Sequence, residues 1–178
     1  MKKFVIITLV LVAAAMTSKA QTNIRLGGGY FGKTLTYPGV VLDVELEEQV
    51  SEKQSMVLRM DLGYFVHKRA FHGLFMDVGY GFRRIFKSGL YLEQLIGVGG
   101  LQTFLNADEV YEAGPDGTIK TGNRWGNLDF SPSFQPGVGF HFPGKSSVWI
   151  RPKLFWQIPH KTSSAYNVAL QVGYSVKL

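Results

Sequence analysis

Apolar and polar side chains alternate with a period of two along this chain. In residues 39–47 and again in residues 55–67, every second side chain is apolar, and charged side chains stand among the others. Successive side chains of a β-strand point to opposite faces, so the pattern predicts strands with one apolar face and one charged face. A soluble sheet turns its charged face to water, whereas a barrel in a membrane turns its apolar face to lipid.

The first twenty residues have the composition of an export signal. Two lysines follow Met1, an apolar run covers residues 4–16, and Ser18-Lys19-Ala20 forms a small-x-small cleavage site. The run is too short to span a bilayer, since a transmembrane helix needs about 20 apolar residues, and an uncleaved anchor would have to be longer. We therefore expect residues 1–20 to be a cleaved signal peptide and residues 21–178 to form one barrel domain.

The composition of the remaining chain bounds its chemistry. The sequence has no cysteine, so the fold does not rely on disulfides. Removing Lys2, Lys3 and Lys19 with the signal lowers the formal net charge from +6 to +3. This charge is small and evenly spread, so we expect no nucleic-acid partner.

Eight segments after the signal have strand character and are bounded by turn residues. They cover residues 22–32, 39–48, 55–67, 73–83, 90–103, 131–142, 148–158 and 165–177. Most reach the 9–11 residues that cross a membrane at a tilt, whereas strands of soluble proteins are usually about 5–6 residues long. Because lipid does not tolerate unpaired backbone, the sheet has to close. The sequence predicts an all-β fold, an eight-stranded antiparallel transmembrane β-barrel with up-and-down meander order.

The connections between these segments differ in length and indicate an orientation. Those at residues 49–54, 84–89 and 143–147 are short, whereas residues 104–130 form a far longer connection. Outer-membrane barrels have short periplasmic turns and longer outer loops. Within the long loop, the turn sequence at residues 114–117 predicts a hairpin that projects beyond the membrane.

One parity of each strand is apolar, and the other carries charges and glycines. Aromatic residues on the apolar parity gather near strand ends, as in the girdles of membrane barrels, although a sandwich core also collects aromatics. An eight-stranded barrel is only wide enough to be filled by its own side chains, so we expect a paired charged network rather than a polar conduit. The predicted interior charges are Arg25, Asp43, Glu45, Arg59, Asp61, Asp77, Glu93, Arg151 and Lys153.

Four residues interrupt the alternation. Pro132, Pro136 and Pro152 lie within predicted strands, where proline removes a ladder donor, so we expect bulges or late strand starts there. Gln94 falls on the apolar parity, and a bulge would shift its side chain to the other face.

The whole pattern after the signal resembles a known group of proteins. The eight alternating strands, the one extended loop and the closing segment 166–178 are similar to the small outer-membrane β-barrels of Gram-negative bacteria, the OmpA-transmembrane-domain and OmpX-like group. Gln21 directly after Ala20 is similar to exported proteins of Bacteroidota. The resemblance implies a monomer in the cell outer membrane with a structural or adhesive role, which contacts lipid and presents residues 104–130 to a protein partner.

Basic residues in the predicted outer loops suggest one further contact. Lys33, Lys68, Arg69 and Lys161 would face anionic lipopolysaccharide, whose phosphates basic side chains can neutralise.

Two alternative functions remain open. His160 lies near Thr162, Ser163 and Ser164 in the last loop, so a lipid-modifying enzyme of the lipid A deacylase kind is one, although no third catalytic member stands out. A soluble periplasmic barrel with an apolar ligand is the other. We expect no metal or cofactor, because the histidines and acids lack ligand spacing. Residues 27–34 match a phosphate-loop expression, but no helical period follows them.

Overall fold

The computed structural model of the chain consists of strands and short turns. It describes residues 22–33, 37–68, 71–106, 111–113, 119–121, 125–126, 128–158 and 165–178. The expected signal peptide lies outside these residues and stays a prediction. The described residues contain no helix long and apolar enough to cross a bilayer.

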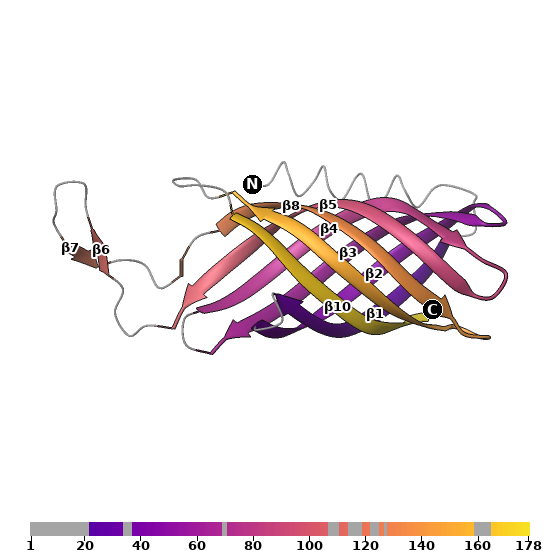
Figure 1. The fold of residues 1–178 in the computed structure, drawn as a ribbon, viewed down its shortest axis with the longest axis horizontal. Coiled ribbons are helices and arrows are strands. Elements are labelled where there is room, and N and C mark those ends of the chain that lie inside the picture. The colour runs from indigo at the N-terminus through magenta and orange to yellow at the C-terminus, as the bar shows by residue number, and fades with distance from the viewer. Residues whose placement is uncertain are drawn as a thin grey trace.

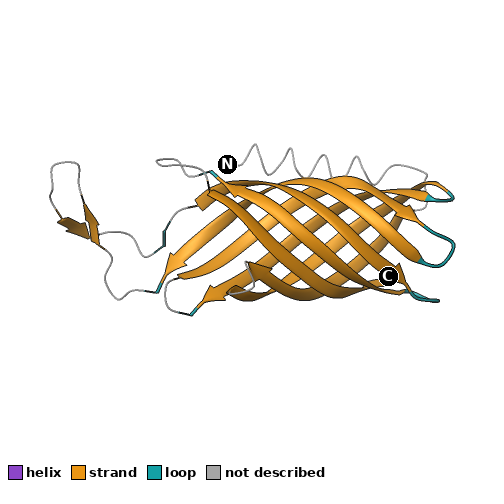
Figure 2. Cartoon of the chain, viewed as in Figure 1, coloured by secondary structure: helices purple, strands orange, loops and turns teal. Residues whose placement is uncertain are grey.

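Eight long antiparallel strands close into a barrel, which confirms the predicted fold class (Figures 1 and 2). The barrel strands are β1 (Thr22–Lys33), β2 (Tyr37–Ser51), β3 (Gln54–His67), β4 (Phe71–Ile85), β5 (Leu90–Leu105), β8 (Leu128–His141), β9 (Ser146–Gln157) and β10 (Ala165–Lys177). Each strand pairs with the one before and after it in this order, and β1 pairs with β10. The strands have 12 to 16 residues, enough to cross a membrane at a tilt.

The two ends of the barrel differ, as the connection lengths indicated. One end holds three short turns and the C-terminus, and the other carries the long connection between β5 and β8 (Figure 1). Within that connection, β6 (Tyr111–Ala113) and β7 (Ile119–Thr121) pair antiparallel, which confirms the predicted hairpin. The hairpin stands off the barrel end in Figure 1. We call the end with the three short turns the turn end, and the end with the long connection the loop end.

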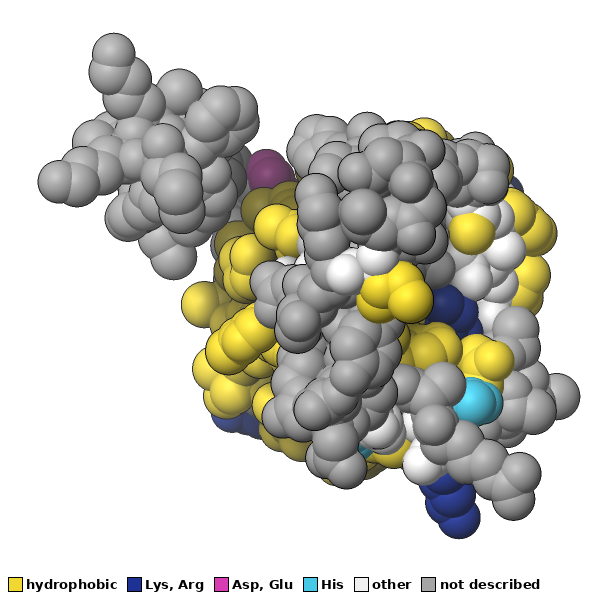
Figure 3. Space-filling view, turned by 90° about the vertical axis from the view of Figure 1, so that its left-hand side faces the viewer, with side chains coloured by type: hydrophobic (Ala, Val, Ile, Leu, Met, Phe, Trp, Pro, Cys, Tyr) yellow, Lys and Arg dark blue, Asp and Glu magenta, His cyan; other side chains and the backbone are white. Residues whose placement is uncertain are grey.

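The apolar side chains face outward. On β5 the neighbours Leu92 and Glu93 are 48% and 2% exposed, and on β2 Leu42 is 62% exposed beside Asp43 at 3%. Apolar side chains cover the flank of the molecule seen beside the loop end in Figure 3. A soluble barrel with an apolar ligand would need the opposite orientation, so this arrangement contradicts that alternative.

Exposed aromatic residues mark both ends of the outer surface. Tyr80 and Phe82 stand on the outer face of β4 toward the turn end, and Tyr64 and Trp156 stand toward the loop end. Aromatic rings prefer the level between headgroups and acyl chains. The two girdles therefore bracket an apolar band, as in membrane barrels.

The three prolines for which bulges or late starts were predicted all lie at one seam of the barrel, between β8 and β9. Pro132 and Pro136 lie on β8, and Pro136 stands opposite Pro152 of β9 in the register of the flanking pairs. The β8–β9 ladder is interrupted there, whereas β8 pairs continuously with β5 and β9 with β10. The register is the same on both sides of the interruption and the strands start early, so the prediction of bulges or late starts is wrong. Because proline has no N–H to donate, this arrangement confines the missing bonds to one seam.

Gln94 stays on the apolar face. It pairs with Phe82 on one side and Pro136 on the other without a register shift. Its side chain is therefore exposed among apolar neighbours, and the bulge expected there is absent. In the described strands, the one register shift lies at Gln49/Ser51, beside the first short turn.

Candidate functional site

The charged interior is the most constrained part of the barrel. All nine side chains expected there lie inside, and each residue is less than a tenth exposed: Arg25, Asp43, Glu45, Arg59, Asp61, Asp77, Glu93, Arg151 and Lys153. The alternation of each strand directs them inward, and closure of the sheet brings cations and acids from different strands together.

Three aspartates form a row across adjacent strands. Asp43, Asp61 and Asp77 are direct partners in the registers of β2, β3 and β4. Like charges directly opposite one another destabilise a sheet unless cations intervene. Each acid has one such cation, and the joining distances are 3.0 Å from Arg151 Nη1 to Asp43 Oδ1, 3.1 Å from Arg59 Nε to Asp61 Oδ1 and 3.3 Å from Lys153 Nζ to Asp77 Oδ2.

A second set of ion pairs, which we call the charged layer, consists of Arg59, Arg83 and Arg151 around Glu45 and Glu93. Arg83 donates from Nη2 to Glu93 Oε2 at 2.6 Å and to Glu45 Oε2 at 2.9 Å. Arg151 donates from Nε to the other Glu93 oxygen at 2.6 Å and also pairs with Glu45. Removing one partner of a buried pair leaves an uncompensated charge and costs about 3–5 kcal/mol, so each member depends on the others.

Arg83 and Glu47 also belong to the charged interior, although neither is among the nine interior charges predicted from the sequence; both lie close to the predicted strand ends. Arg83 is 0% exposed, and Glu47 accepts from Arg83 Nη1 and from Arg25 Nε, both at 3.2 Å. Both residues continue the inward parity of their strands, Glu47 after Glu45 and Arg83 after Asp77. Extending the parity to the strand ends would have found them.

Aromatic rings lie against two of the arginines. The Cζ atom of Arg83 is 4.4 Å from the Tyr91 ring centroid, and that of Arg151 is 4.0 Å from the Trp149 ring. Glycines leave room for these rings. A Cβ on Gly139 would lie 2.3 Å from the Tyr91 ring. A face-on ring stabilises a desolvated cation by about 2 kcal/mol, so the rings support the charged layer.

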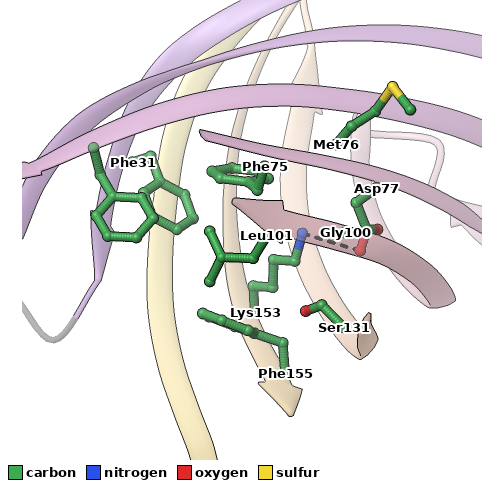
Figure 4. A pocket seen from close by; sticks show the side chains of 10 residues that line it. Phe31, Phe75, Met76, Asp77, Gly100, Leu101, Ser131, Lys153 and Phe155 are labelled. Carbon is green, nitrogen blue, oxygen red and sulfur yellow. Dashed lines mark ion pairs between the residues drawn. The ribbon is translucent and has the colours of Figure 1, made fainter. Parts of the chain in front are cut away.

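Toward the loop end, the interior becomes apolar. We call Phe31, Phe65, Phe75, Leu101 and Phe155 the aromatic layer. The ring of Phe31 lies 4.6 Å from Phe75 and 5.6 Å from Phe65, centroid to centroid. Figure 4 shows Lys153 extending to Asp77, with Phe75 above it and Phe155 below it. The cavity they enclose measures about 10 Å³, enough for about one water molecule. In the described interior the two layers form a plug, which speaks against a polar conduit.

Lys33 does not lie on the outer surface, where contact with lipopolysaccharide was expected. It is 7% exposed, and its Nζ donates to Gln157 Oε1 at 3.2 Å inside the barrel mouth. The same atom lies within 5.5 Å of the Phe65 ring centroid. The glycine-rich sequence before it hides the parity of β1, and the strand continues to Lys33 instead of ending at Gly32.

The other basic residues of that prediction have different outcomes. Lys68 is exposed at the loop end. Arg69 and Lys161 lie outside the described residues, as do His160, Thr162, Ser163 and Ser164, so the enzymatic alternative stays a prediction. Among the described residues, no three histidine, aspartate or glutamate side chains are grouped to hold a metal ion.

The described histidines are half-buried near strand ends, and each contacts an aromatic ring. His72 lies on β4, and its Nδ1 is 2.6 Å from the Tyr64 hydroxyl. His67 ends β3 and stacks on Phe71, and His141 ends β8 and stacks on Tyr91. Their surroundings indicate packing roles at the strand ends.

Solved structures resemble the fold of this chain, although its sequence matches no known protein family. No protein-family model and no curated protein matches the chain. Ail, the attachment invasion locus protein of Yersinia pestis, aligns with a TM-score of 0.57 at 9% identity, over 90% of this chain and 100% of Ail. The structure of Ail in complex with the heparin analogue sucrose octasulfate aligns with a TM-score of 0.56. Neisserial surface protein A gives 0.50 at 6% identity, over 88% of this chain and 94% of that protein.

The chain has the fold of the small eight-stranded outer-membrane β-barrels. This likeness agrees with the outward apolar band and the closed wall, which hides every backbone edge from lipid. At such low sequence identity it concerns the fold, and the function has to be argued from the surfaces of this chain.

Proposed function

We propose that this protein is a monomeric outer-membrane protein of the OmpA-transmembrane-domain and OmpX-like group, from a Gram-negative bacterium of the Bacteroidota kind, with a structural and adhesive role. The observation that carries the proposal is a closed barrel with an apolar outer face and a filled interior. A filled barrel cannot conduct solutes, so its value to the cell lies in its wall and its loops. Closure also leaves no strand edge for pairing with a second copy.

The adhesive part of the proposal rests on the loop end. The β6–β7 hairpin stands off the barrel, and Ile119 of β7 is 75% exposed. Trp125, which packs against Phe104 at the barrel end, is 68% exposed. Exposed apolar side chains on a projecting segment are suited to burial against a partner protein. Ail, which shares the fold, is described as an attachment protein. Contact with lipopolysaccharide through Lys68, Arg69 and Lys161 belongs to the same proposal.

Deletion of residues 107–123 tests the adhesive role. Cells that display the intact protein should attach to a partner surface, and cells that display the deletion should not. The control is Glu52→Gln at the turn end, which should attach like the wild type. Heat-modifiable electrophoretic mobility should persist in both variants, because the loop contributes nothing to barrel closure. Unchanged attachment after the deletion would contradict the adhesive role.

A further inference from the structure

A basic hollow lies at the turn end of the barrel, where the β2–β3 and β4–β5 turns meet. Lys53, Arg84, Ile85, Phe86 and Lys87 line it. The three cations are exposed, and none forms an ion pair among the described residues. The Ile85 N–H donates to the Lys53 carbonyl at 2.8 Å, which fixes the two turns to each other. Three positive charges are thus held together, and among the described residues no acid lies within ion-pair distance of them.

An apolar hollow lies beside these cations on the outer wall. It is lined by Met56, Tyr80, Gly81, Phe82, Gln94, Ile96 and Phe134. Phe82 and Arg84 are successive outward residues of β4, so the apolar and basic hollows adjoin along that strand. Such an arrangement offers an apolar surface that ends at positive charge.

Gln94 is the polar exception within the apolar hollow. Its side chain is exposed, and it has no hydrogen-bond partner among the described residues. An unpaired amide costs free energy in hydrocarbon. The placement of this donor just inside the level of Arg84 points to a ligand with an acceptor at that depth.

We propose that the two hollows bind one anionic phospholipid from the leaflet at the turn end. An acyl chain lies in the apolar hollow, the Gln94 amide donates to an ester carbonyl, and Arg84, Lys53 and Lys87 hold the phosphate. Arginine binds phosphate oxygens with paired hydrogen bonds, and each basic side chain at an anionic surface contributes about a fivefold preference. The inference rests on the proposed membrane location and adds a lipid class and a site to it.

A second apolar hollow on the same wall provides a contrast. It lies over β5, β8, β9, β10 and β1, and its lining residues include Leu90, Phe140, Val148, Ile150 and Tyr174. No basic or amide side chain lines it. It should accept acyl chains of any lipid, so selectivity for the headgroup has to come from the basic hollow.

Native mass spectrometry of the full refolded chain tests the site. The probes are phosphatidylglycerol and phosphatidylcholine with identical acyl chains. The wild type should retain phosphatidylglycerol preferentially. The double variant Lys53→Gln/Arg84→Gln should lose this preference by about tenfold to thirtyfold, because two basic contacts are removed. Lys145→Gln/Lys177→Gln removes two charges from the same end and should keep the preference.

Three outcomes would overturn the site: no preference in the wild type, an equal loss in both double variants, or an unchanged preference in the first. A separate variant, Gln94→Leu, should weaken the binding of each lipid by about fivefold, which corresponds to the loss of one hydrogen bond. The ratio of the two lipid affinities should stay unchanged. Every variant is first checked for heat-modifiable mobility. A failure there would count against the membrane barrel itself, whereas a folded barrel without lipid preference counts against the site alone.

Discussion

The charged layer and the aromatic layer fill the same barrel by different means. Each charged side chain is stabilised by partners of opposite sign from other strands, as Glu93 is by three arginines. Each ring is stabilised by the volume it occupies, as Phe75 is by its contact with Phe31. The interior is therefore not uniform along the barrel axis. Loss of one charged member leaves an unpaired charge, whereas loss of one ring leaves a space.

The largest effect is expected from Glu93→Leu. Three buried guanidinium groups would lose a shared carboxylate, so the free energy of unfolding should fall by about 3–5 kcal/mol. Urea unfolding in lipid vesicles, followed by electrophoretic mobility, measures this loss. The control is Glu52→Gln in an exposed turn, which should change stability by less than about 0.5 kcal/mol. A loss below about 1 kcal/mol for Glu93→Leu would contradict mutual dependence in the charged layer.

Phe75→Ala probes the aromatic layer in the same assay. The variant should lose about 3 kcal/mol, at the lower end for a buried phenylalanine, because the nearby mouth admits water into the new space. Phe82→Ala removes a ring from the outer face, where lipid can fill the gap, and should cost clearly less. Equal losses of unfolding free energy in the two variants would show that an interior ring stabilises the barrel no more than a lipid-facing ring does.

Gly63→Ala tests whether the absence of a Cβ at this glycine makes room for the Phe75 ring. A Cβ at this position would lie 2.1 Å from the Phe75 ring, so the ring has to move, at a cost of about 1–3 kcal/mol. In a Phe75→Leu background the same change should cost less, and the difference measures the coupling between the two residues. Gly28→Ala is the matched control, since its Cβ meets the flexible Leu42 side chain at 3.2 Å and the Val41 carbonyl oxygen at an ordinary contact distance of 3.5 Å. If the costs of Gly63→Ala and Phe75→Leu are additive, the two residues are not in contact.

The smallest effect is expected at the boundary between the layers. Lys153 reaches Asp77 with its Nζ, which also lies 4.7 Å from the Phe75 ring centroid. Asp77 keeps hydrogen bonds from Ser133 at 3.1 Å and Gln135 at 2.9 Å, so Lys153→Met should cost only about 1–2 kcal/mol. Lys145→Met, at an exposed turn, is the control. A loss as large as that of Glu93→Leu would place Lys153 in the charged layer.

Most of the fold was predictable because its signal is local. The period of two fixes which face of a strand is apolar, and this gave the strand positions and the orientation of Leu42 or Ile96. The turn residues at 114–117 gave the hairpin for the same reason. Where the local signal is weak, in the glycine-rich end of β1, the direction of Lys33 was missed.

The contacts across the barrel were not predictable. The pairing of Arg151 with Asp43 joins residues 108 positions apart, and it depends on how the closed sheet staggers its strands. The prolines show the reverse case. A local rule predicted bulges, but the position of Pro136 opposite Pro152 satisfies the rule without one, and that position depends on the register of the whole sheet.

The barrel strands turn an apolar face to lipid and their charged side chains inward. Two of the three tryptophans allow a direct test, because Trp156 is 41% exposed on the outer face and Trp149 is 1% exposed inside. In vesicles of lipids with brominated acyl chains, a variant that keeps only Trp156 should be strongly quenched, and one that keeps only Trp149 should retain its fluorescence. Quenching of Trp149 with a bright Trp156 would contradict the account.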